Sequence, residues 1–289
     1  MKYLFKRSFP KYADLHIHTD RSDGLLSTDQ VIIKANKVGL SAISITDHDT
    51  VDGIEPAISS GKRHNVEIIP GLEISAEYNG EEIHILGYFI DWQDQALNKA
   101  LQTFRDARHE RALKMMEKLN QLGIKIEHSD VFKITKLDYV GRPHLAVALV
   151  QNGYADTISD AFQKFLGNNA PAYIPKPAFS PYEAIKMILD SHGIPVLAHP
   201  GMLKQDVLDE LISYGLMGIE AYHSYHSNQI TDYYRDIAIK NKLLITGGSD
   251  FHGFENSKRV LGDVKLPYEY VEKLKEAVID RIYKTGLTK

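Results

Sequence analysis

The sequence predicts an α/β protein in which parallel strands and helices alternate around a barrel, with a mainly helical segment inserted into it. Short strand-like runs alternate with helical patterns over the first ninety residues and again after residue 190. Histidine and acidic residues gather where these strand-like runs end. This arrangement is typical of a barrel whose functional site lies at the carboxyl ends of its strands.

The first part of the barrel is expected to contain three strands joined by two helices. The strands are expected at residues 12–18, 41–46 and 66–69. Ser27 and Thr28 are suitable N-caps for the first helix, and Gly39 is suitable just beyond its end. The second helix is expected to begin near Thr50. Units of this kind place their strands parallel, with right-handed crossovers and the helices outside.

A β-hairpin is expected after Gly71, because Asn79-Gly80 strongly favours a type I′ turn between two alternating runs. A two-residue loop sets the register of the two strands, which makes Glu73 and His84 diagonal neighbours on one face. The register therefore predicts that these two side chains lie close enough to share a metal cluster.

The remaining segments divide into an insertion and a second part of the barrel. Residues 91–180 are expected to form a helical, substrate-recognition insertion, and residues 1–90 and 181–289 the barrel. Further strands are expected at residues 195–198, 217–222 and 243–246.

The first helix of the insertion is expected from an apolar stripe between Leu97 and Leu119 that stops at Gly123. Arg105, Arg108 and Arg111 lie between the apolar positions. Runs of charge on a helix are usually solvated, and we interpret these arginines as a solvent-exposed face.

The composition restricts the chemistry that is available. The chain has 289 residues, of which 43% are hydrophobic and 25% charged, with no cysteine and 13 histidines. The lack of cysteine excludes disulfides, thiolate metal sites and a catalytic thiol. Any transition-metal site must therefore use imidazole and carboxylate ligands, which suit Zn, Mn or Fe.

The charge balance bears on partners and location. The formal net charge is -4, so we expect no binding of long duplex nucleic acid and none of anionic membranes. The chain contains no apolar run of membrane-spanning length and no signal-peptide core, and a cytoplasmic location is expected.

The polar residues at the expected strand ends are of the types that bind divalent metals. They are His16, His18, Asp23, His48, Glu73, His84, His199, Asp250 and His252. Chance is a poor explanation for all nine at successive strand ends, so we expect a metal site. Asp14, Asp47 and Asp49 are expected either to orient ligand imidazoles or to hold turns.

The sequence resembles the PHP superfamily, named for polymerase and histidinol phosphatase, in six ordered motifs. These are DLHIHTDRSDG, ITDHDT, PGLE, HILG, AHPG and GSDFHG, within residues 10–90 and 190–255. The resemblance implies a distorted (β/α)7 barrel of the PHP fold that binds two or three divalent metal ions.

The resemblance also implies three ligand sets. One metal would take His16, His18, Glu73 and Asp250. A second would share Glu73 and add His84 and His199, and a third would take Asp23, His48 and His252. Glu73 is suited to the shared position because its two carboxylate oxygens can each bind a cation.

The expected activity is that of a metal-dependent phosphoesterase. A hydroxide bridging the metals would attack phosphorus in line, with Glu73, Asp250 and His252 as the catalytic residues that act through it. By resemblance, the substrate is expected to be a small phosphorylated molecule, in particular a nucleotide such as a 3′,5′-bisphosphate nucleotide.

Three alternatives stay open. They are a histidinol-phosphate phosphatase, a 5′-3′ exonuclease acting on short single-stranded RNA, and a non-catalytic accessory module. The complete ligand set argues against the accessory module. Substrate contacts are expected from Arg142 and His144 in the insertion, from Lys176 at its end, and from His223 after a barrel strand.

Overall fold

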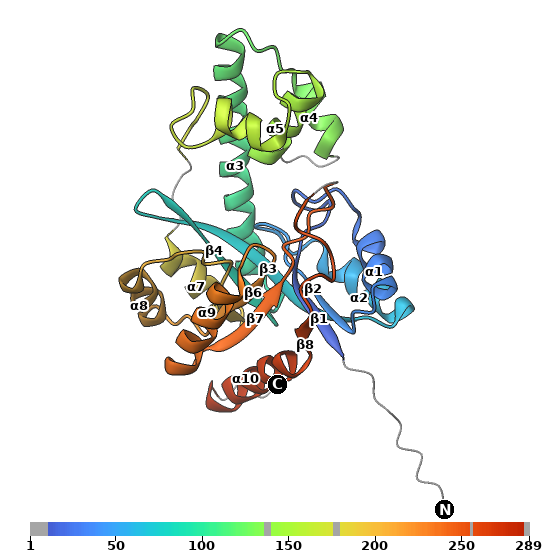
Figure 1. The fold of residues 1–289 in the computed structure, drawn as a ribbon, viewed down its shortest axis with the longest axis vertical. Helices are drawn as coiled ribbons and strands as arrows, with labels where there is room; N and C mark the ends of the chain where they lie inside the picture. The colour runs from blue at the N-terminus through green and yellow to red at the C-terminus, as the bar shows by residue number, and fades with distance from the viewer. Residues whose placement is uncertain (1–10, 136–139, 176–179, 255–256, 286–289) are drawn as a thin grey trace, which may run out of the picture.

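Eight strands form a nearly closed barrel in the computed structural model, which describes residues 11–135, 140–175, 180–254 and 257–285 (Figure 1). The strands follow one another in the order β7-β6-β5-β4-β3-β2-β1-β8. Their bounds are β1 Tyr12–Ile17, β2 Ala42–Ile45, β3 Glu67–Tyr78, β4 Glu81–Tyr88, β5 Ile194–Leu197, β6 Gly218–His223, β7 Leu244–Gly248 and β8 Leu266–Pro267. The expected α/β barrel with a helical insertion is therefore confirmed.

The barrel is mixed rather than wholly parallel. Strands β1, β2 and β3 are parallel, as are β5, β6 and β7. Between these two groups, β4 is antiparallel to both β3 and β5. The short strand β8, which the sequence pattern did not indicate, is antiparallel to β1.

The barrel closes between β1 and the end of β7. Ile17 forms a parallel bridge with Phe251, and the amide of His18 donates to the carbonyl of Phe251 at 2.9 Å. A Cβ atom at Gly248 would lie 2.3 Å from the Cβ of His16. Only glycine therefore allows β7 to approach the histidine-bearing end of β1 this closely.

The hairpin has the register that the turn predicts. Asn79 and Gly80 have φ angles of 52° and 84°, as a type I′ turn requires. Glu73 pairs with Leu86, and Ser75 pairs with His84. Strand β3 is longer than expected, because it continues without a break from the barrel into the hairpin.

Six helices of the described chain flank the barrel strands, and the first of them lies where the sequence predicts it. Their bounds are α1 Thr28–Lys37, α2 Ile54–His64, α7 Pro181–Asp190, α8 Gln205–Ser213, α9 Asn228–Lys240 and α10 Glu269–Thr285. The side chain of Ser27 caps α1 by accepting a hydrogen bond from the amide of Gln30, and Gly39 follows the helix with a φ of 81°. Helix α2 begins at Ile54, later than expected, because residues 52 and 53 form a turn before it.

Helix α10 packs at the end of the barrel that lies away from the insertion (Figure 1). Val271 and Leu274 on this helix are fully buried and belong to the same hydrophobic cluster as Leu15 and Tyr88 of the barrel. The helix therefore covers one end of the barrel with apolar side chains and leaves the other end available for a polar site.

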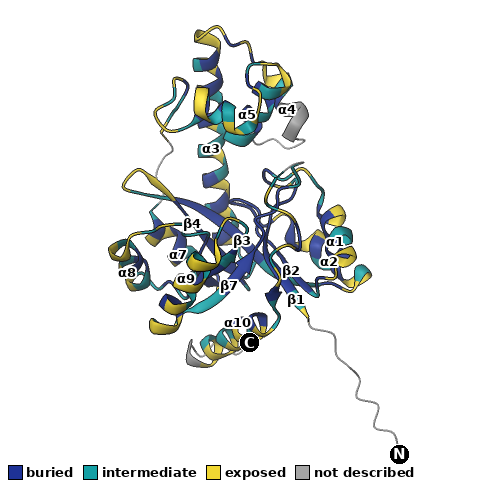
Figure 2. Ribbon diagram, viewed as in Figure 1, coloured by how far each residue is buried: buried dark blue, intermediate teal, exposed yellow. Residues whose placement is uncertain are grey.

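The segment expected to be an insertion is mainly helical where it is described. It contains α3 Gln95–Gln121, α4 His128–Thr135, α5 Arg142–Gln151, α6 Ile158–Ala161 and the π-helical turn Phe162–Leu166. Leu97, Leu101 and Phe104 pack into a barrel cluster, whereas Met115 and Leu119 pack into a separate cluster of the insertion. One long helix thus connects two hydrophobic cores, and its inner face is buried along most of its length (Figure 2).

No helix in the described part of the chain is both long and apolar enough to cross a membrane.

Candidate metal centre and adjoining cavity

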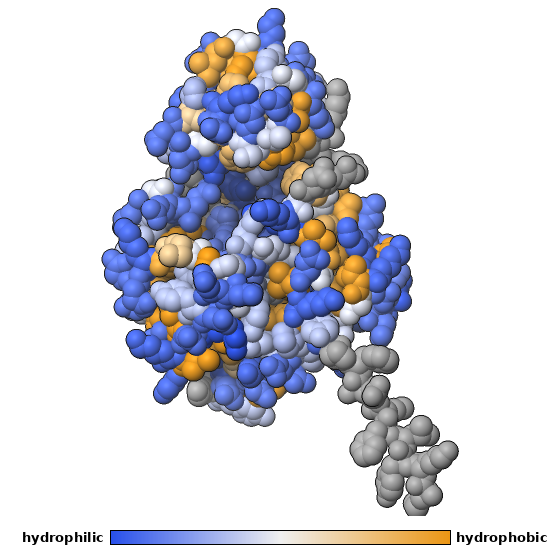
Figure 3. All heavy atoms as spheres, viewed as in Figure 1, coloured by the Kyte–Doolittle hydropathy of each residue, from blue (hydrophilic) through white to orange (hydrophobic). Residues whose placement is uncertain are grey.

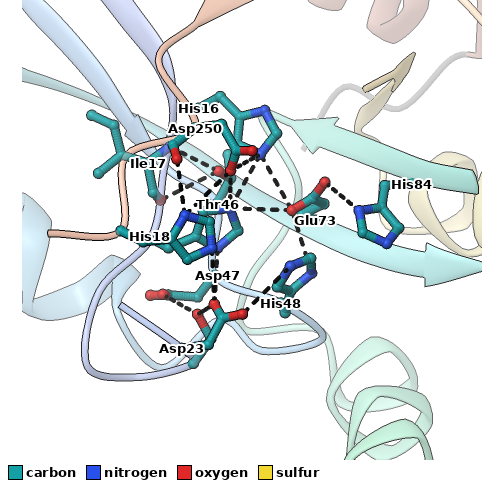
Figure 4. Close-up of polar contacts among 12 residues, drawn as sticks. His16, Ile17, His18, Asp23, Thr46, Asp47, His48, Glu73, His84 and Asp250 are labelled. Carbon is teal, nitrogen blue, oxygen red and sulfur yellow. Dashed lines mark hydrogen bonds and ion pairs between the residues drawn. The ribbon is translucent and has the colours of Figure 1, made fainter. Parts of the chain in front are cut away.

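The nine predicted metal-site residues lie together at the barrel end that faces the insertion. Figure 4 labels all of them except His199 and His252. They come from β1, β3 and β4 and from the segments that follow β1, β2, β5 and β7. Seven of them are buried, and His84 and His199 are partly exposed. The carboxyl ends of the parallel strands thus gather them at one place, as the barrel geometry predicts.

Glu73 lies at the centre of this cluster. Its Oε2 atom is 3.2 Å from Nε2 of His16, 3.2 Å from Nε2 of His18 and 3.3 Å from Nδ1 of His48. This buried oxygen has no hydrogen bond of acceptable geometry with any described residue. A buried carboxylate oxygen surrounded by imidazole nitrogens in this way suits a cation.

The second oxygen of Glu73 faces a different pair of histidines. Its Oε1 atom is 2.9 Å from Nδ1 of His84 and 3.1 Å from Nε2 of His199. The predicted proximity of Glu73 and His84 is thus confirmed, and its cause is the register of the hairpin. Because each oxygen has its own histidines, Glu73 has the geometry of a carboxylate that bridges two cations.

Asp250 adds a second carboxylate beside the first group. Its Oδ1 atom is 3.2 Å from Nε2 of His18 and 3.5 Å from Nε2 of His16. Asp250 has a φ of 53°, in the left-handed region that costs energy for a residue other than glycine. The neighbouring amide of Ser249 donates to Oδ1 of the buried Asp14 at 2.8 Å, which helps to hold this conformation.

Asp23 collects the remaining histidines on the other side of His18. Its Oδ1 atom is 3.3 Å from Nε2 of His252 and 3.6 Å from Nδ1 of His18, and its Oδ2 atom is 3.9 Å from Nε2 of His48. The ligand atoms of Asp23, His18, His48 and His252 all lie within 4.8 Å of one another. Asp23, His48 and His252, which form the third predicted set, therefore lie together with His18 in one part of the cluster.

The electrostatics of the cluster also fit divalent cations. Although burial opposes it, the neighbouring histidines hold the pKa values of Glu73, Asp23 and Asp250 well below their usual range. Burial lowers the pKa of His48 to about 3. Against burial, hydrogen bonds to Asp250 and Glu73 raise the pKa of His18 to about 10. Three ionised carboxylates thus require nearby positive charge, which protons or divalent cations can supply.

Glu220 on β6 contacts two predicted site residues and was missed by sequence reasoning. It is fully buried, and its Oε1 atom lies 3.0 Å from Nδ1 of His16 across the barrel interior. Its Oε2 atom accepts a hydrogen bond from the amide of His199 at 2.8 Å. A carboxylate on the outer nitrogen of a histidine fixes the ring so that the inner nitrogen can bind a metal. The only sequence signal was a charged residue inside an apolar strand.

Two of the three additional aspartates, Asp47 and Asp49, mainly hold loops. Asp47 accepts hydrogen bonds from the amide of Thr19 and from the hydroxyl of Ser22, both at 2.7 Å, and so shapes the loop that carries Asp23. Asp49 accepts from the amide of Ser75 at 2.9 Å. Of the two expected roles, these contacts favour the structural one for Asp47 and Asp49.

A cavity of about 820 Å³ adjoins the cluster and extends to the insertion. The space-filling view shows a hydrophilic hollow between the insertion and the barrel (Figure 3). His48, Glu73 and Asp250 lie on its barrel wall, and Arg108 and Arg142 are among the insertion residues that line it. A small molecule in this cavity would therefore lie between the metal-site residues and a cationic wall.

The arginines of α3 contradict the expectation of a solvent-exposed helix face. Arg111 is only 7% exposed, and its Nε donates to the carbonyl of Ile174 at 2.6 Å. The Nη1 atom of Arg108 donates to Oδ2 of Asp49 at 2.6 Å. The expectation was wrong for Arg108 and Arg111 because they lie on the side of the helix that borders the cavity.

The four predicted substrate residues have different positions. Arg142 lines the cavity, and its Nη2 donates to Oε1 of Glu82 at 2.5 Å. His144 and His223 are buried, and neither is among the described residues that line the cavity. Lys176 lies outside the described residues.

The two buried histidines have other partners. Nδ1 of His144 accepts a hydrogen bond from the amide of Gly141 at 3.0 Å, at the start of α5. Burial lowers the pKa of His144 to about 4. Nε2 of His223 faces Oδ2 of Asp250 at 3.6 Å. Both side chains therefore support residues that border the cavity.

Comparisons with known proteins agree with this site. The PHP domain family model matches residues 14–168. The phosphoribosyl 1,2-cyclic phosphate 1,2-diphosphodiesterase of Eggerthella lenta is 30% identical over 252 residues, which are 83% of this chain and 94% of that protein. The 3′,5′-nucleoside bisphosphate phosphatase of Chromobacterium violaceum is 29% identical over 86% of this chain and 90% of its own length.

Two further proteins are similar over most of the chain. The 5′-3′ exoribonuclease Rnm of Escherichia coli is 31% identical over 83% of this chain and 84% of that protein. The crystal structure of a candidate metal-dependent phosphoesterase from Bifidobacterium adolescentis superimposes with a TM-score of 0.85 at 31% identity, over 92% of this chain and 96% of that one. The chain therefore belongs to the PHP domain family and is a metal-dependent phosphoesterase, a hydrolase of phosphoric ester bonds.

Proposed function

We propose that this enzyme removes phosphate from a small phosphorylated metabolite, in particular a nucleotide such as a 3′,5′-bisphosphate nucleotide. The observation that carries the proposal is the position of Glu73, whose two oxygens face separate histidine groups beside a cavity of about 820 Å³. The insertion lines the same cavity with arginines. Phosphate esters match both features. Cations can stabilise the reacting phosphoryl group, and arginines can bind further anionic groups of the same molecule.

The proposed metal centre consists of the nine residues in three sets, for two or three ions of Mn, Fe or Zn. The first proposed set is His16, His18, Glu73 and Asp250. The second is Glu73, His84 and His199, and the third is Asp23, His48 and His252. When bound, the cations would neutralise phosphoryl charge and activate the attacking water. Glu73, Asp250 and His252 would hold the reacting groups in place, and burial would exclude bulk water.

Recognition of the substrate is assigned mainly to the cavity wall. Arg142 would bind an anionic group remote from the reacting phosphate, because its guanidinium lines the cavity. Phe162, Tyr225 and Phe254 line the same space and offer ring surfaces for a base. The similarity to the Chromobacterium violaceum bisphosphate phosphatase supports a nucleotide.

The other predicted substrate residues enter the proposal indirectly. His144 would position the Gly141-Arg142 end of α5, since it caps that helix. His223 would act through Asp250, which it faces. Lys176 stays a prediction.

A second candidate is 5′-3′ hydrolysis of short single-stranded RNA. The similarity to the Escherichia coli exoribonuclease supports it, and the reaction would use the same metal centre on a phosphodiester. The formal net charge of -4 is unfavourable for long duplex nucleic acid, so only short strands are proposed.

A substrate panel tests the proposal. The protein is purified without chelator, its metal content is measured by mass spectrometry, and hydrolysis is followed with added Mn²⁺. The substrates are adenosine 3′,5′-bisphosphate, AMP, histidinol phosphate, a ribose cyclic phosphate and a short 5′-phosphorylated RNA. We expect the bisphosphate to have the highest kcat/KM.

Each other outcome has a defined meaning. A higher kcat/KM for RNA would favour the second candidate, and one for histidinol phosphate or the cyclic phosphate would show that the substrate assignment is wrong. Glu73→Gln is the inactive control, because it keeps the shape of the side chain but removes its charge.

A further inference from the structure

Arg259 is a cationic residue of the cavity wall that does not belong to the proposed metal centre. It follows β7 and lines the cavity on the barrel side. Its Nη1 atom is 3.0 Å from Oδ2 of Asp250, whereas the other oxygen of Asp250 faces His16 and His18. Arg259 therefore lies next to the metal-site residues, on the outer side of a carboxylate whose inner side belongs to the cluster.

The guanidinium of Arg259 is held in place, but not all of its N–H donors have a hydrogen-bond partner among the described residues. Its central carbon lies 5.1 Å from the ring centroid of Tyr225, which also lines the cavity. Its Nε atom is buried and has no hydrogen bond with any described residue. A guanidinium has five N–H donors, so the contacts to Asp250, to Nδ1 of His252 at 3.4 Å and to Tyr225 leave donors for a further acceptor.

The charge balance changes when Asp250 binds a cation. A carboxylate that neutralises a divalent ion can no longer neutralise Arg259 to the same extent. Arg259 would then hold an uncompensated positive charge on the cavity wall, directly beside the place where a phosphoryl group must react. A planar guanidinium is well suited to phosphate oxygens.

We propose that Arg259 binds a non-bridging oxygen of the phosphoryl group that reacts at the metal centre. The assignment rests on the proposed function, because it requires the phosphoryl group to lie beside Asp250. It adds a recognition residue from the barrel to those offered by the insertion.

The test measures binding of inorganic phosphate to the Mn²⁺-loaded protein by calorimetry, together with metal content by mass spectrometry. We expect Arg259→Met to weaken phosphate binding by roughly 10- to 100-fold, as loss of a charged hydrogen bond predicts, with unchanged metal content. Arg259→Lys should keep part of the affinity, because it keeps the charge but loses the planar fork.

Arg235 provides a matched control. It lies 5.9 Å from the ring centroid of Tyr222, forms an ion pair with Asp232 at 3.1 Å and also has a buried Nε without a described partner. It is not among the described residues that line the cavity. Arg235→Met should therefore leave both phosphate binding and metal content unchanged.

Three results would overturn the assignment. Unchanged phosphate affinity in Arg259→Met would do so directly. Loss of metal from Arg259→Met would show that Arg259 acts only by positioning Asp250. A wild-type protein that binds metal but no phosphate would also contradict it, whereas a wild-type protein that binds no metal would contradict the proposed function itself.

Discussion

The two walls of the cavity are built on different principles. On the barrel wall, short side chains such as Glu73 and Asp250 are buried and held by a strand or by the segment directly after one. On the insertion wall, Arg108 and Arg142 are long side chains held by ion pairs to barrel residues, at 2.6 Å and 2.5 Å. The proposed function assigns the reaction to the barrel wall and substrate recognition to the insertion wall.

Substitutions on the two walls should therefore have distinct effects on the enzyme. Changes on the barrel wall should alter metal content and kcat, because they remove groups that hold the reacting centre. Changes on the insertion wall should alter KM, because they remove contacts that are similar in the bound substrate and in the transition state.

The largest effect is expected for Glu73→Gln. The substitution removes the charge that both histidine groups face, so at least one cation should be lost. Activity should fall by roughly 10³-fold or more, which corresponds to several kcal/mol of lost charge stabilisation. Metal content by mass spectrometry and kcat are the measurements. Glu77→Gln on the same strand is the control, and full metal content in Glu73→Gln would contradict the bridging position.

A pH-dependent effect is expected for His144, which is buried in α5 of the insertion. Burial lowers its pKa to about 4 from an ordinary value of 6.5, so the folded protein favours the neutral ring. Between these values the unfolded chain binds more protons, and stability is therefore lost as the pH falls from 6.5 to 4. The full contribution is roughly 3 kcal/mol.

The measurement compares urea unfolding of wild type and His144→Gln at several pH values in this range. The free energy of unfolding should fall more steeply for the wild type than for the variant. Parallel curves would show that His144 does not titrate with a lowered pKa.

Glu220→Gln should have an intermediate effect on the barrel wall. It weakens the contact that fixes the ring of His16, although it leaves all nine predicted ligands in place. Losses of 10- to 100-fold in metal affinity are typical of such changes. Titration with Mn²⁺ measures the affinity, and wild-type affinity in Glu220→Gln would assign Glu220 to packing alone.

The smallest effect is expected on the insertion wall. Arg142→Met should raise KM about tenfold with little change in kcat or metal content, because one charged contact is lost. Glu82→Gln separates two explanations, since it breaks the ion pair of Arg142 but keeps the guanidinium. Equal changes in KM for both variants would show that the ion pair, rather than substrate contact, is responsible.

Much of the barrel and the metal centre could be predicted, because the relevant information is local. Strand ends, the Asn79-Gly80 turn and the histidine spacing depend on neighbouring residues and on the periods of strands and helices. The hairpin register that brings His84 to Glu73 follows from the turn alone.

The remaining features depend on contacts between residues far apart in the chain. Glu220 meets His16 only because β6 and β1 face each other across a closed barrel. Arg108 and Arg111 were wrongly expected to be exposed to solvent. A helical pattern shows which residues are polar, but it does not show which residues of other elements they contact.

The sequence by itself determined the family, the barrel, the helical character of the insertion and the residues that converge at the strand ends. Only the tertiary structure decided which carboxylate oxygen faces which histidine, which arginines line the cavity and what holds the ligands in place. The reason is physical: periodicity and turn geometry act over a few residues, whereas burial and the partner of a side chain depend on the packing of the whole chain.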